Sequence, residues 1–324
     1  MSQRKRVTRE DVARLAGVSV PVVTYTLNGG PKNVSPATRA RVMDAVERLG
    51  YRPNAAARAL RRGRSELLGF IVPSVANPLF AAFARTVEIA AAARDVTVIV
   101  LSASPGEVHV AIERLAAHQV DGILIATPMH TADIAALEHS GLTAVLLGQQ
   151  SAIDGIPTFG VDLYGGARAA VEHLVDRGHS AIAYFGPADP ESRRLQGWRD
   201  ALSAHGHATC PVIDADFSRE AGYAAVLTLL REHPHTTAVF ASSDQIAIGA
   251  VLALHENGIA LPEDMAIVSF DDSPDAEYSW PPLTAVRQPI ETMAAAAVER
   301  LLGAEGPEHV RFPVQLIARA STGG

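Results

Sequence analysis

Residues 7–28 read VTREDVARLAGVSVPVVTYTLN, and this stretch has the pattern of two short helices joined by a tight turn. Thr8 can cap a first helix over about residues 9–16, and Asp11, three residues later, can complete a capping box. Gly17 suits the left-handed conformation in which many helices end. We therefore expect the first helix to begin and end sharply.

A second helix is expected over residues 20–27, with Ser19 as its cap and Pro21 in its first turn, where the missing N–H costs little. Helical spacing predicts a small core between the two helices made of Val12, Ala16, Val18, Val23 and Leu27. The same spacing turns outward Val20, Pro21, Thr24 and Tyr25. A helix-turn-helix reads the major groove with the first residues of its second helix, so these four are candidate base readers. A plain helical hairpin is the alternative.

The segments that follow favour the helix-turn-helix over the plain helical hairpin. Ser35-Pro36 opens a third helix that runs to Leu49 and stops at Gly50, and the sequence YRPNAAARAL follows. The ordered series VTREDVARLAGVS, SPATRARV and LGYRPNAAARAL closely resembles the DNA-binding headpiece and hinge of the lactose-repressor family of bacterial transcription regulators. The resemblance runs through the headpiece without a break and continues into the rest of the chain.

This resemblance implies a homodimer that binds a palindromic site in double-stranded operator DNA. In the family, hinge helices form on the operator and each inserts a leucine into the minor groove, and Leu60 is the matching residue. The candidate DNA contacts are Thr8, Ser19, Val20, Pro21, Thr24, Tyr25, Asn28, Ser35, Thr38, Asn54, Ala57 and Leu60. Tyr25 stands where members commonly carry an arginine, which puts the usual two-point contact to guanine in doubt.

Charge is distributed unevenly along the chain. The 324 residues carry a net charge of −7, yet residues 1–64 hold 14 Lys and Arg against four acidic residues, a net of +10. The remainder holds 14 basic and 31 acidic residues, a net of −17. A basic head on an acidic body points to a polyanionic partner for the head alone. We expect phosphate contacts mainly from Arg4, Lys5, Arg6, Lys32, Arg39 and the caps Ser19 and Ser35.

Composition indicates a soluble protein of two or three domains, with 48% hydrophobic and 19% charged residues. No run of about 18 apolar residues can span a membrane, and charges occupy the place of a signal peptide's apolar core. We therefore expect a cytoplasmic protein with no membrane contact. Cys210 is the only cysteine, which excludes an internal disulfide and a multi-cysteine zinc site, and no metal or cofactor is expected.

From residue 66 onward, short apolar runs alternate with amphipathic helical patterns. Strands are expected at residues 67–75, 97–102, 122–126, 145–148, 159–161, 181–185, 212–214, 238–241 and 266–270. Helices are expected at residues 78–94, 106–118, 132–138, 164–177, 191–205, 219–232 and 245–257. Unbroken apolar strands such as GILIA are buried on both faces and hence parallel. The fold class is therefore α/β, with two doubly wound parallel-sheet lobes, preceded by the all-α headpiece.

These lobes resemble the periplasmic sugar-binding-protein fold, which the family uses as its core and in which the chain crosses between lobes three times. Together with the headpiece reading, the resemblance implies four parts: a headpiece at 1–49, a hinge at 50–65, a first lobe at 66–160 plus 289–312, and a second lobe at 161–288 plus 313–324. A doubly wound lobe binds ligands at the carboxyl ends of its strands. We expect a small-molecule effector in a cleft there.

Several motifs at strand ends match the family, among them NPLF (residues 77–80), RLQGW (194–198), SDQIAIG (243–249) and FDD (270–272). Positions matching Phe80, Arg194, Phe217 and Asp271 contact effector in the family, and the matching motifs add Asp162, Ser243 and Gln288 as candidates. An aromatic face, a guanidinium and a carboxylate suit a small polar ring such as a sugar. As alternatives, Phe80 fits a core position, Asp271 a cap and Arg194 a surface ion pair.

Two further departures from the family matter. Ser243 replaces a common asparagine, which puts an amide contact to the effector in doubt. No heptad pattern follows Thr322, so we do not expect tetramers of the lactose-repressor kind.

Signatures of catalysis are missing: the chain has no phosphate-binding GxxxxGK[ST] loop, no GxSxG elbow and no HExxH among its 12 histidines. We therefore expect no enzyme but a dimeric, ligand-responsive transcription factor, most simply a repressor of a carbohydrate-use operon released by a sugar or sugar derivative. The alternatives are an exported solute-binding protein, which the basic head argues against, and an enzyme of sugar metabolism on a doubly wound fold.

Overall fold

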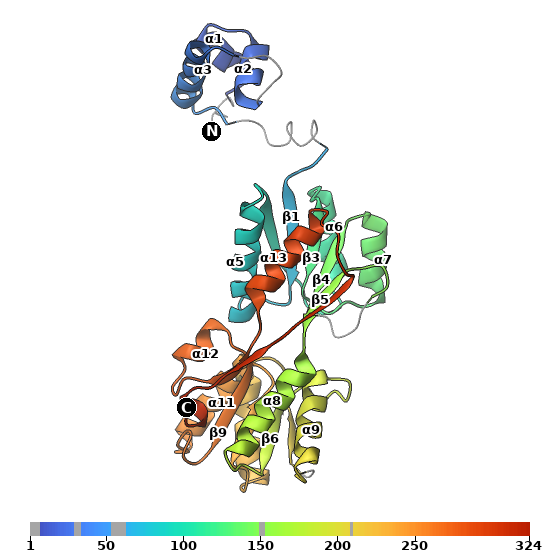
Figure 1. Ribbon diagram of the computed structural model, residues 1–324, viewed down its shortest axis with the longest axis vertical. Coiled ribbons are helices and arrows are strands. Elements are labelled where there is room, and N and C mark those ends of the chain that lie inside the picture. Colours follow the sequence, from blue (N-terminus) through green and yellow to red (C-terminus); the bar gives the residue numbers. More distant parts are fainter. Residues whose placement is uncertain (1–6, 29–33, 53–62, 149–152, 208–209) are drawn as a thin grey trace, which may run out of the picture. The chain divides into compact units, whose positions relative to one another are not determined.

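The computed structural model describes residues 7–28, 34–52, 63–148, 153–207 and 210–324 (Figure 1). The chain divides into two compact units, Met1–Ser65 and Glu66–Gly324, which we describe one at a time. The first unit is helical, and the second contains two six-stranded sheets.

The first unit contains α1 (Arg9–Ala16), α2 (Val20–Asn28) and α3 (Pro36–Leu49). Its core consists of Val12, Ala13, Ala16, Val23, Val42, Ala45 and Tyr51, with Val18 and Leu27 packed against it. The five core residues predicted from helical spacing all belong to this cluster. The three predicted helices are confirmed to within one residue at each end.

The ends of α1 and α3 follow the predicted capping chemistry. The Thr8 hydroxyl accepts the Asp11 N–H at 3.3 Å, and the Asp11 carboxylate accepts the Thr8 N–H at 3.0 Å, which completes a capping box. Gly17 ends α1 at φ 64°, and Gly50 ends α3 at φ 60°. A side chain would be strained in this left-handed conformation, so glycine is required by the turn rather than by packing.

The first sheet of the second unit has the strand order β11-β5-β4-β3-β1-β2, and all neighbouring strands are parallel. Its strands are β1 (Leu67–Val72), β2 (Thr97–Ser102), β3 (Gly122–Ile125), β4 (Ala144–Leu147), β5 (Thr158–Val161) and β11 (His309–Phe312). The last of these comes from a part of the sequence about 150 residues beyond β5. The first lobe is therefore discontinuous in sequence.

Helices cover both faces of this sheet, as Figure 1 shows, and they are α5 (Pro78–Ala92), α6 (Val108–Ala117), α7 (Thr131–Ser140) and α13 (Ile290–Leu301). Alternate residues of one strand point to opposite faces. Phe70 packs with α5 and α13, whereas Ile71 packs with α6 and α7. This two-sided burial explains the unbroken apolar runs in the sequence.

The second sheet has the order β12-β10-β9-β8-β6-β7, and only β12 runs antiparallel to its neighbour. Its strands are β6 (Ile182–Gly186), β7 (Val212–Asp214), β8 (Ala238–Ala241), β9 (Ala266–Asp271), β10 (Thr284–Arg287) and β12 (Gln315–Ile317). Because β6, β8 and β9 are parallel, their carboxyl ends meet at one edge. This edge carries three of the predicted effector residues, Arg194 after β6, Ser243 after β8 and Asp271 at the end of β9.

Two helix pairs cover the second sheet. Tyr184 and Phe270 belong to the core shared with α8 (Leu163–Asp176) and α9 (Arg193–Ala204). Phe185 belongs to the core shared with α10 (Arg219–Glu232) and α11 (Asp244–Glu256). A short helix α12 (Pro274–Tyr278) follows β9, and a 3-10 turn η1 (Ala320–Thr322) follows β12.

The predicted fold class is confirmed, with differences at the ends of elements. The first strand was expected to reach Val75 but ends at Val72, because Pro73 has no N–H to donate to a neighbouring strand. Six elements after β9 were not predicted: α12, β10, α13, β11, β12 and the 3-10 turn η1.

Candidate functional site

The predicted base-reading residues lie on α2. Val20 and Pro21, in its first turn, are exposed, whereas Thr24 and Tyr25 are half-buried. The Thr24 hydroxyl donates to the Val20 carbonyl at 3.0 Å within the helix. Ser19 directly precedes the helix, and its carbonyl accepts the Val22 N–H at 3.0 Å. The start of α2 therefore presents an apolar and partly polar surface without an arginine.

Two arginines of α3 tie the three helices together. The Arg41 Nε donates to the Ala16 carbonyl of α1, and the Arg39 Nη1 donates to the Thr26 carbonyl of α2, each at 3.3 Å. In the structure, Arg39 makes this hydrogen bond to Thr26 within the headpiece. Its contact with a DNA phosphate remains a prediction. At the start of α3, Ser35 accepts the Thr38 N–H at 3.3 Å and its hydroxyl lies 2.9 Å from the Thr38 hydroxyl.

Several predicted DNA contacts lie outside the described residues. They are Arg4, Lys5, Arg6, Lys32, Asn54, Ala57 and Leu60. Asn28 is the last residue of α2. These assignments remain predictions from the sequence.

In the second unit, two predicted effector residues contact the carboxylate of a third. Asp271 is the last residue of β9, Arg194 lies in the first turn of α9, and Gln288 follows β10. The Asp271 Oδ1 lies 3.3 Å from the Arg194 Nη2 and accepts a hydrogen bond from the Gln288 Nε2 at 2.6 Å. The Arg194 and Asp271 side chains are 16% and 7% exposed. This pair is not the surface ion pair that the sequence left open.

Arg194 is also held by aromatic rings. Its guanidinium carbon lies 4.3 Å from the ring centre of Phe270 and 5.7 Å from that of Phe217. Both distances fall within the range of cation–π contacts. Phe217 itself is 49% exposed, so about half of the residue's surface remains available for contact with another molecule.

Asp271 has an unusual backbone and an unusual carboxyl group. Its φ is 114°, and the next residue, Asp272, has φ 52°, so two consecutive non-glycine residues lie in the positive region. Such strain persists only where the surroundings hold it, and it gathers at functional sites. Burial raises the pKa of Asp271 to about 6, although Arg194 and Gln288 both act to lower it.

A second buried carboxylate, that of Asp244, was missed by the sequence analysis. Asp244 opens α11, is 1% exposed, and accepts hydrogen bonds from the Ser269 hydroxyl and the Ser273 N–H, both at 2.5 Å. Burial, together with the charge of Asp271, raises its pKa to about 7. Two acids thus share the edge at which β9 ends. The available signal was the acid directly after Ser243 in the SDQIAIG motif.

The remaining predicted effector residues have local structural roles. The Ser243 side chain accepts the Ile246 N–H at 3.4 Å and caps α11, and the Asp162 side chain accepts the Gly165 N–H at 3.0 Å and caps α8. Phe80 is half-buried and packs against the core of the first sheet, and its contact with an effector remains a prediction.

Two buried hydroxyls near the end of β6 were also missed. Tyr184 and Ser242 are fully buried, and among the described residues neither hydroxyl has a hydrogen-bond partner in good geometry, although the Ser192 and Ser242 side chains lie near enough to act on the Tyr184 phenol. The Arg194 Nε is also buried and has no hydrogen-bond partner among the described residues. A Cβ at Gly186 would overlap the Ser242 hydroxyl and lie 2.8 Å from that of Tyr184, so both surround this glycine. Buried polar groups without partners are suited to a polar ligand.

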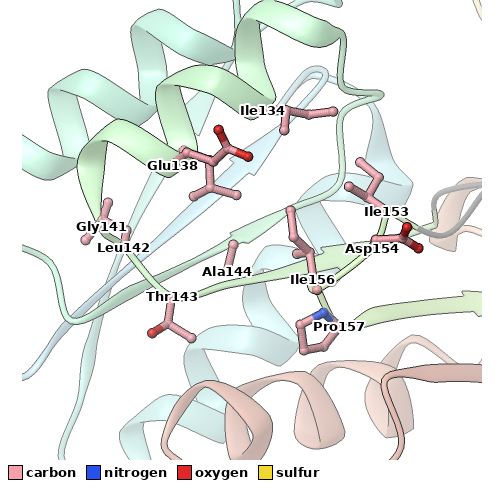
Figure 2. Close-up of a pocket in the computed structure, with 12 residues that line it drawn as sticks. Ile134, Glu138, Gly141, Leu142, Thr143, Ala144, Ile153, Asp154, Ile156 and Pro157 are labelled. Carbon is pink, nitrogen blue, oxygen red and sulfur yellow. The ribbon is translucent and has the colours of Figure 1, made fainter.

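A separate cavity of about 470 Å³ lies in the first lobe, at the other edge of the sheet (Figure 2). The end of α7 and the residues before β4 and β5 line it, including Leu137, Ala144 and Pro157. Its charged groups are Glu138 and Asp154. None of the predicted effector residues lines this cavity, and strands begin there rather than end. It does not fit the effector site expected of a doubly wound lobe.

Among the described residues, no group of three or more His, Cys, Asp or Glu side chains is arranged to hold a metal ion. No helix within those residues is long and apolar enough to cross a membrane.

Comparisons with known proteins match both units. Residues 8–54 match the family described as bacterial regulatory proteins, lacI family, and residues 171–322 match a periplasmic binding protein-like domain. The HTH-type transcriptional regulator CelR of Thermobifida fusca is 36% identical, covering 97% of each chain. A structure of a CelR–cellobiose complex has a TM-score of 0.69 at 32% identity, covering 98% of this chain and 100% of the other.

The lac repressor dimer bound to operator and the anti-inducer ONPF is more similar in structure. Its TM-score is 0.84 at 30% identity, and the alignment covers 98% of this chain and 99% of that one. The agreement extends over the helix-turn-helix and both sheets. The chain therefore belongs to the lacI family of bacterial regulatory proteins, as a cytoplasmic DNA-binding transcription regulator and not an enzyme.

Proposed function

We propose that this regulator is a dimeric repressor of a carbohydrate-use operon and that a sugar or sugar-derived effector weakens its grip on the operator. The observation that carries the proposal is the cluster of Arg194, Asp271 and Gln288 at the carboxyl end of β9. A related regulator, CelR, has been solved as a complex with cellobiose.

The chemistry of this cluster suits a polyhydroxylated ring. The Asp271 carboxylate can accept hydrogen bonds from hydroxyls, and the guanidinium of Arg194 can donate to hydroxyl or ring oxygens. The exposed ring of Phe217 offers a face on which the apolar side of a sugar can stack. The buried hydroxyls of Tyr184 and Ser242 supply further donors and acceptors.

In the proposed arrangement, residues 1–49 read the DNA, 50–65 form the hinge, and the two lobes (66–160 with 289–312, and 161–288 with 313–324) hold the effector. Val20, Pro21, Thr24 and Tyr25 meet base edges, because they lie at the start of α2. Basic side chains of the head meet phosphates, which makes binding fall steeply with salt. Leu60 is the proposed minor-groove wedge.

Two exposed aromatic side chains support the dimer. Tyr278 and Trp280 are 84% and 80% exposed, and both lie at the end of α12 or just after it. Large apolar side chains exposed this close together mark contact surfaces. A symmetric pair of headpieces then requires an operator with two half-sites. Sedimentation of wild type and of a Tyr278→Ser, Trp280→Ser double variant tests this: an unchanged dimer would place the interface elsewhere.

The effector can be sought by thermal unfolding of the full chain against cellobiose, galactose, ribose, sugar phosphates and nucleobases. A ligand of the native state raises stability by RT ln(1 + [L]/Kd), so a hit at 100 times its Kd adds about 2.7 kcal/mol. A compound that stabilises the protein should also weaken its binding to an operator fragment in a gel mobility-shift assay. If only compounds without hydroxyls bind, the carbohydrate assignment fails.

The assignment of the site is tested with Arg194→Met and Asp271→Asn. Both variants should bind the operator as wild type does and lose the response to the hit, because removing one partner strands buried polar groups of the ligand. Arg168→Met is the matched control, since it removes an arginine whose 2.7 Å bond to Glu172 lies within α8. Near-wild-type affinity for the hit in both site variants would show that the effector binds elsewhere.

A further inference from the structure

The residue after Asp271 is held by two arginines from distant parts of the chain. The Asp272 side chain is 3% exposed, and each of its carboxylate oxygens accepts a charged hydrogen bond. Oδ1 lies 2.7 Å from the Arg319 Nη1, and Oδ2 lies 2.6 Å from the Arg287 Nε. Neither arginine belongs to the effector residues predicted from the sequence.

Arg319 is the more firmly fixed of the two. Its side chain is 15% exposed against 50% for Arg287, and its Nη1 also donates to the Leu283 carbonyl at 2.6 Å. Its backbone N–H donates to the Thr284 hydroxyl at 2.8 Å. Because solvent screens a half-exposed pair far more than a buried one, we expect Arg319 to dominate the hold on Asp272.

The segment that carries Arg319 is itself anchored across two strands. The Ser321 hydroxyl donates to the Ile267 carbonyl of β9 at 2.6 Å and accepts the Thr284 N–H of β10 at 2.8 Å. Ser321 is fully buried. Arg319 therefore projects from a fixed base rather than from a mobile tail.

This hold matters because the backbone at residues 271 and 272 is strained. Positive φ values at two consecutive aspartates would relax if nothing opposed it. On one side the turn is tied by Asp244, which accepts the Ser273 N–H. On the other side the ion pair of Asp272 with Arg319 supplies the second tie. A turn fixed on both sides keeps Asp271 facing Arg194 and Gln288.

We propose that Arg319 and Asp272 are positioning residues of the effector site: their ion pair holds the turn after β9 so that the Asp271 carboxylate stays on Arg194 and Gln288. The pair does not itself touch the effector. This inference rests on the proposed function only in giving Asp271 an effector to bind. The positioning itself is a property of the free protein and can be measured without any ligand.

The test uses the full chain without effector, in three variants and one control. Arg319→Met removes the charge and keeps an unbranched apolar stem, Arg319→Lys restores a charge, and Asp272→Asn keeps the shape of the side chain. Arg168→Met again serves as control, because it removes an arginine of another ion pair that does not touch the turn. Crystal structures and amide hydrogen exchange are recorded for each.

In Arg319→Met and Asp272→Asn, we expect amides 271–273 to exchange about tenfold faster or more, since local opening becomes easier. The Asp271 carboxylate should leave the Arg194 guanidinium. Arg319→Lys should recover part of the protection, and Arg168→Met should match wild type. The β8 amides serve as an internal reference and should not change in any variant.

The proposal is overturned if Asp271 keeps its place and its exchange rate in both Arg319→Met and Asp272→Asn, even if those variants melt earlier. Arg319 would then merely stabilise the fold, and Asp244 would hold the turn alone. If Arg319→Met does not fold, Asp272→Asn decides. A separate titration of the same variants with the sugar returned by the thermal screen tests the other role: if the turn moves but that sugar binds as tightly as it does to wild type, the positioning stands and the effector role of Asp271 fails.

Discussion

Replacing Arg194 with methionine should destabilise the effector-binding unit, by an amount that depends on pH. The change removes the guanidinium 3.3 Å from the Asp271 carboxylate and leaves the bond from Gln288. Breaking a buried ion pair costs about 3–5 kcal/mol, because one charge is left uncompensated. Asp271 is 7% exposed and can escape part of this cost by taking up a proton. We therefore expect a loss of about 3 kcal/mol at pH 8.

The direction with pH follows from the raised pKa of Asp271, which is about 6 in the folded protein against an ordinary value of 3.8. A carboxyl whose folded pKa is raised favours folding when protonated, and that stability is lost as pH rises through the folded pKa. Arg194 lowers this pKa, so its removal raises the pKa further and extends the loss toward pH 8. At pH 5 the carboxyl is protonated in wild type and variant alike, and the difference should fall below about 1 kcal/mol.

Thermal unfolding of the Glu66–Gly324 unit within the full chain measures this difference. For a unit of this size about 1 kcal/mol shifts Tm by roughly 2 °C, so we expect a drop of about 6 °C at pH 8 and less than about 2 °C at pH 5. The control Arg168→Met breaks a pair whose side chains are both 40% exposed and therefore screened by solvent, and its Tm should change little at either pH. Equal drops at both pH values for Arg194→Met would refute the electrostatic account of this site.

Three further predictions concern other parts of the chain. Gly249→Ala should cost about 2 kcal/mol or more in urea unfolding, because the added Cβ overlaps the Arg219 carbonyl oxygen, whereas Gly306→Ala meets nothing within 4 Å and should be near neutral; similar midpoints for both would contradict this. Tyr25→Arg should change the preferred base in each half-site, and selection from randomised operators would show an unchanged consensus if Tyr25 were not a reader. Thr8→Ala should lower headpiece stability by about 1 kcal/mol, because it removes the α1 cap. A melting curve that overlays that of wild type would contradict this.

Local signals in the sequence were sufficient for the headpiece. Thr8, Asp11 and Gly17 each act on residues a few positions away, so the bounds of α1 follow from neighbouring chemistry. The long helices and apolar strands of the two lobes were equally clear. By contrast, β12 has three residues, lies at the edge of its sheet and pairs antiparallel with β10, so it lacks the buried apolar run that identified the other strands.

The sequence was sufficient to predict where the effector site lies but not which of its side chains contact one another. That Arg194 and Asp271 would lie at one edge follows from the parallel strands and the family resemblance. That Arg194 would be stacked on Phe270 and Asp272 bonded to Arg319 depends on contacts between residues 76 and 47 positions apart. Side-chain pairing over such separations is set by packing, which sequence periodicity does not encode.

The interleaved strand order has a consequence for how this protein is made. Strand β11, at residues 309–312, completes the first sheet, and β12, at residues 315–317, completes the second. On a ribosome, neither sheet can gain its last strand until almost the whole chain has been synthesised, although β5 was made some 150 residues before β11 and β1 some 240 residues before it. During that interval β5 presents an unpaired edge, which is a site for association with other chains. Both sheets therefore lack their last strand for most of synthesis and gain it almost at the same time. Chaperones that shield unpaired strand edges should matter more for this chain than its ordinary size suggests.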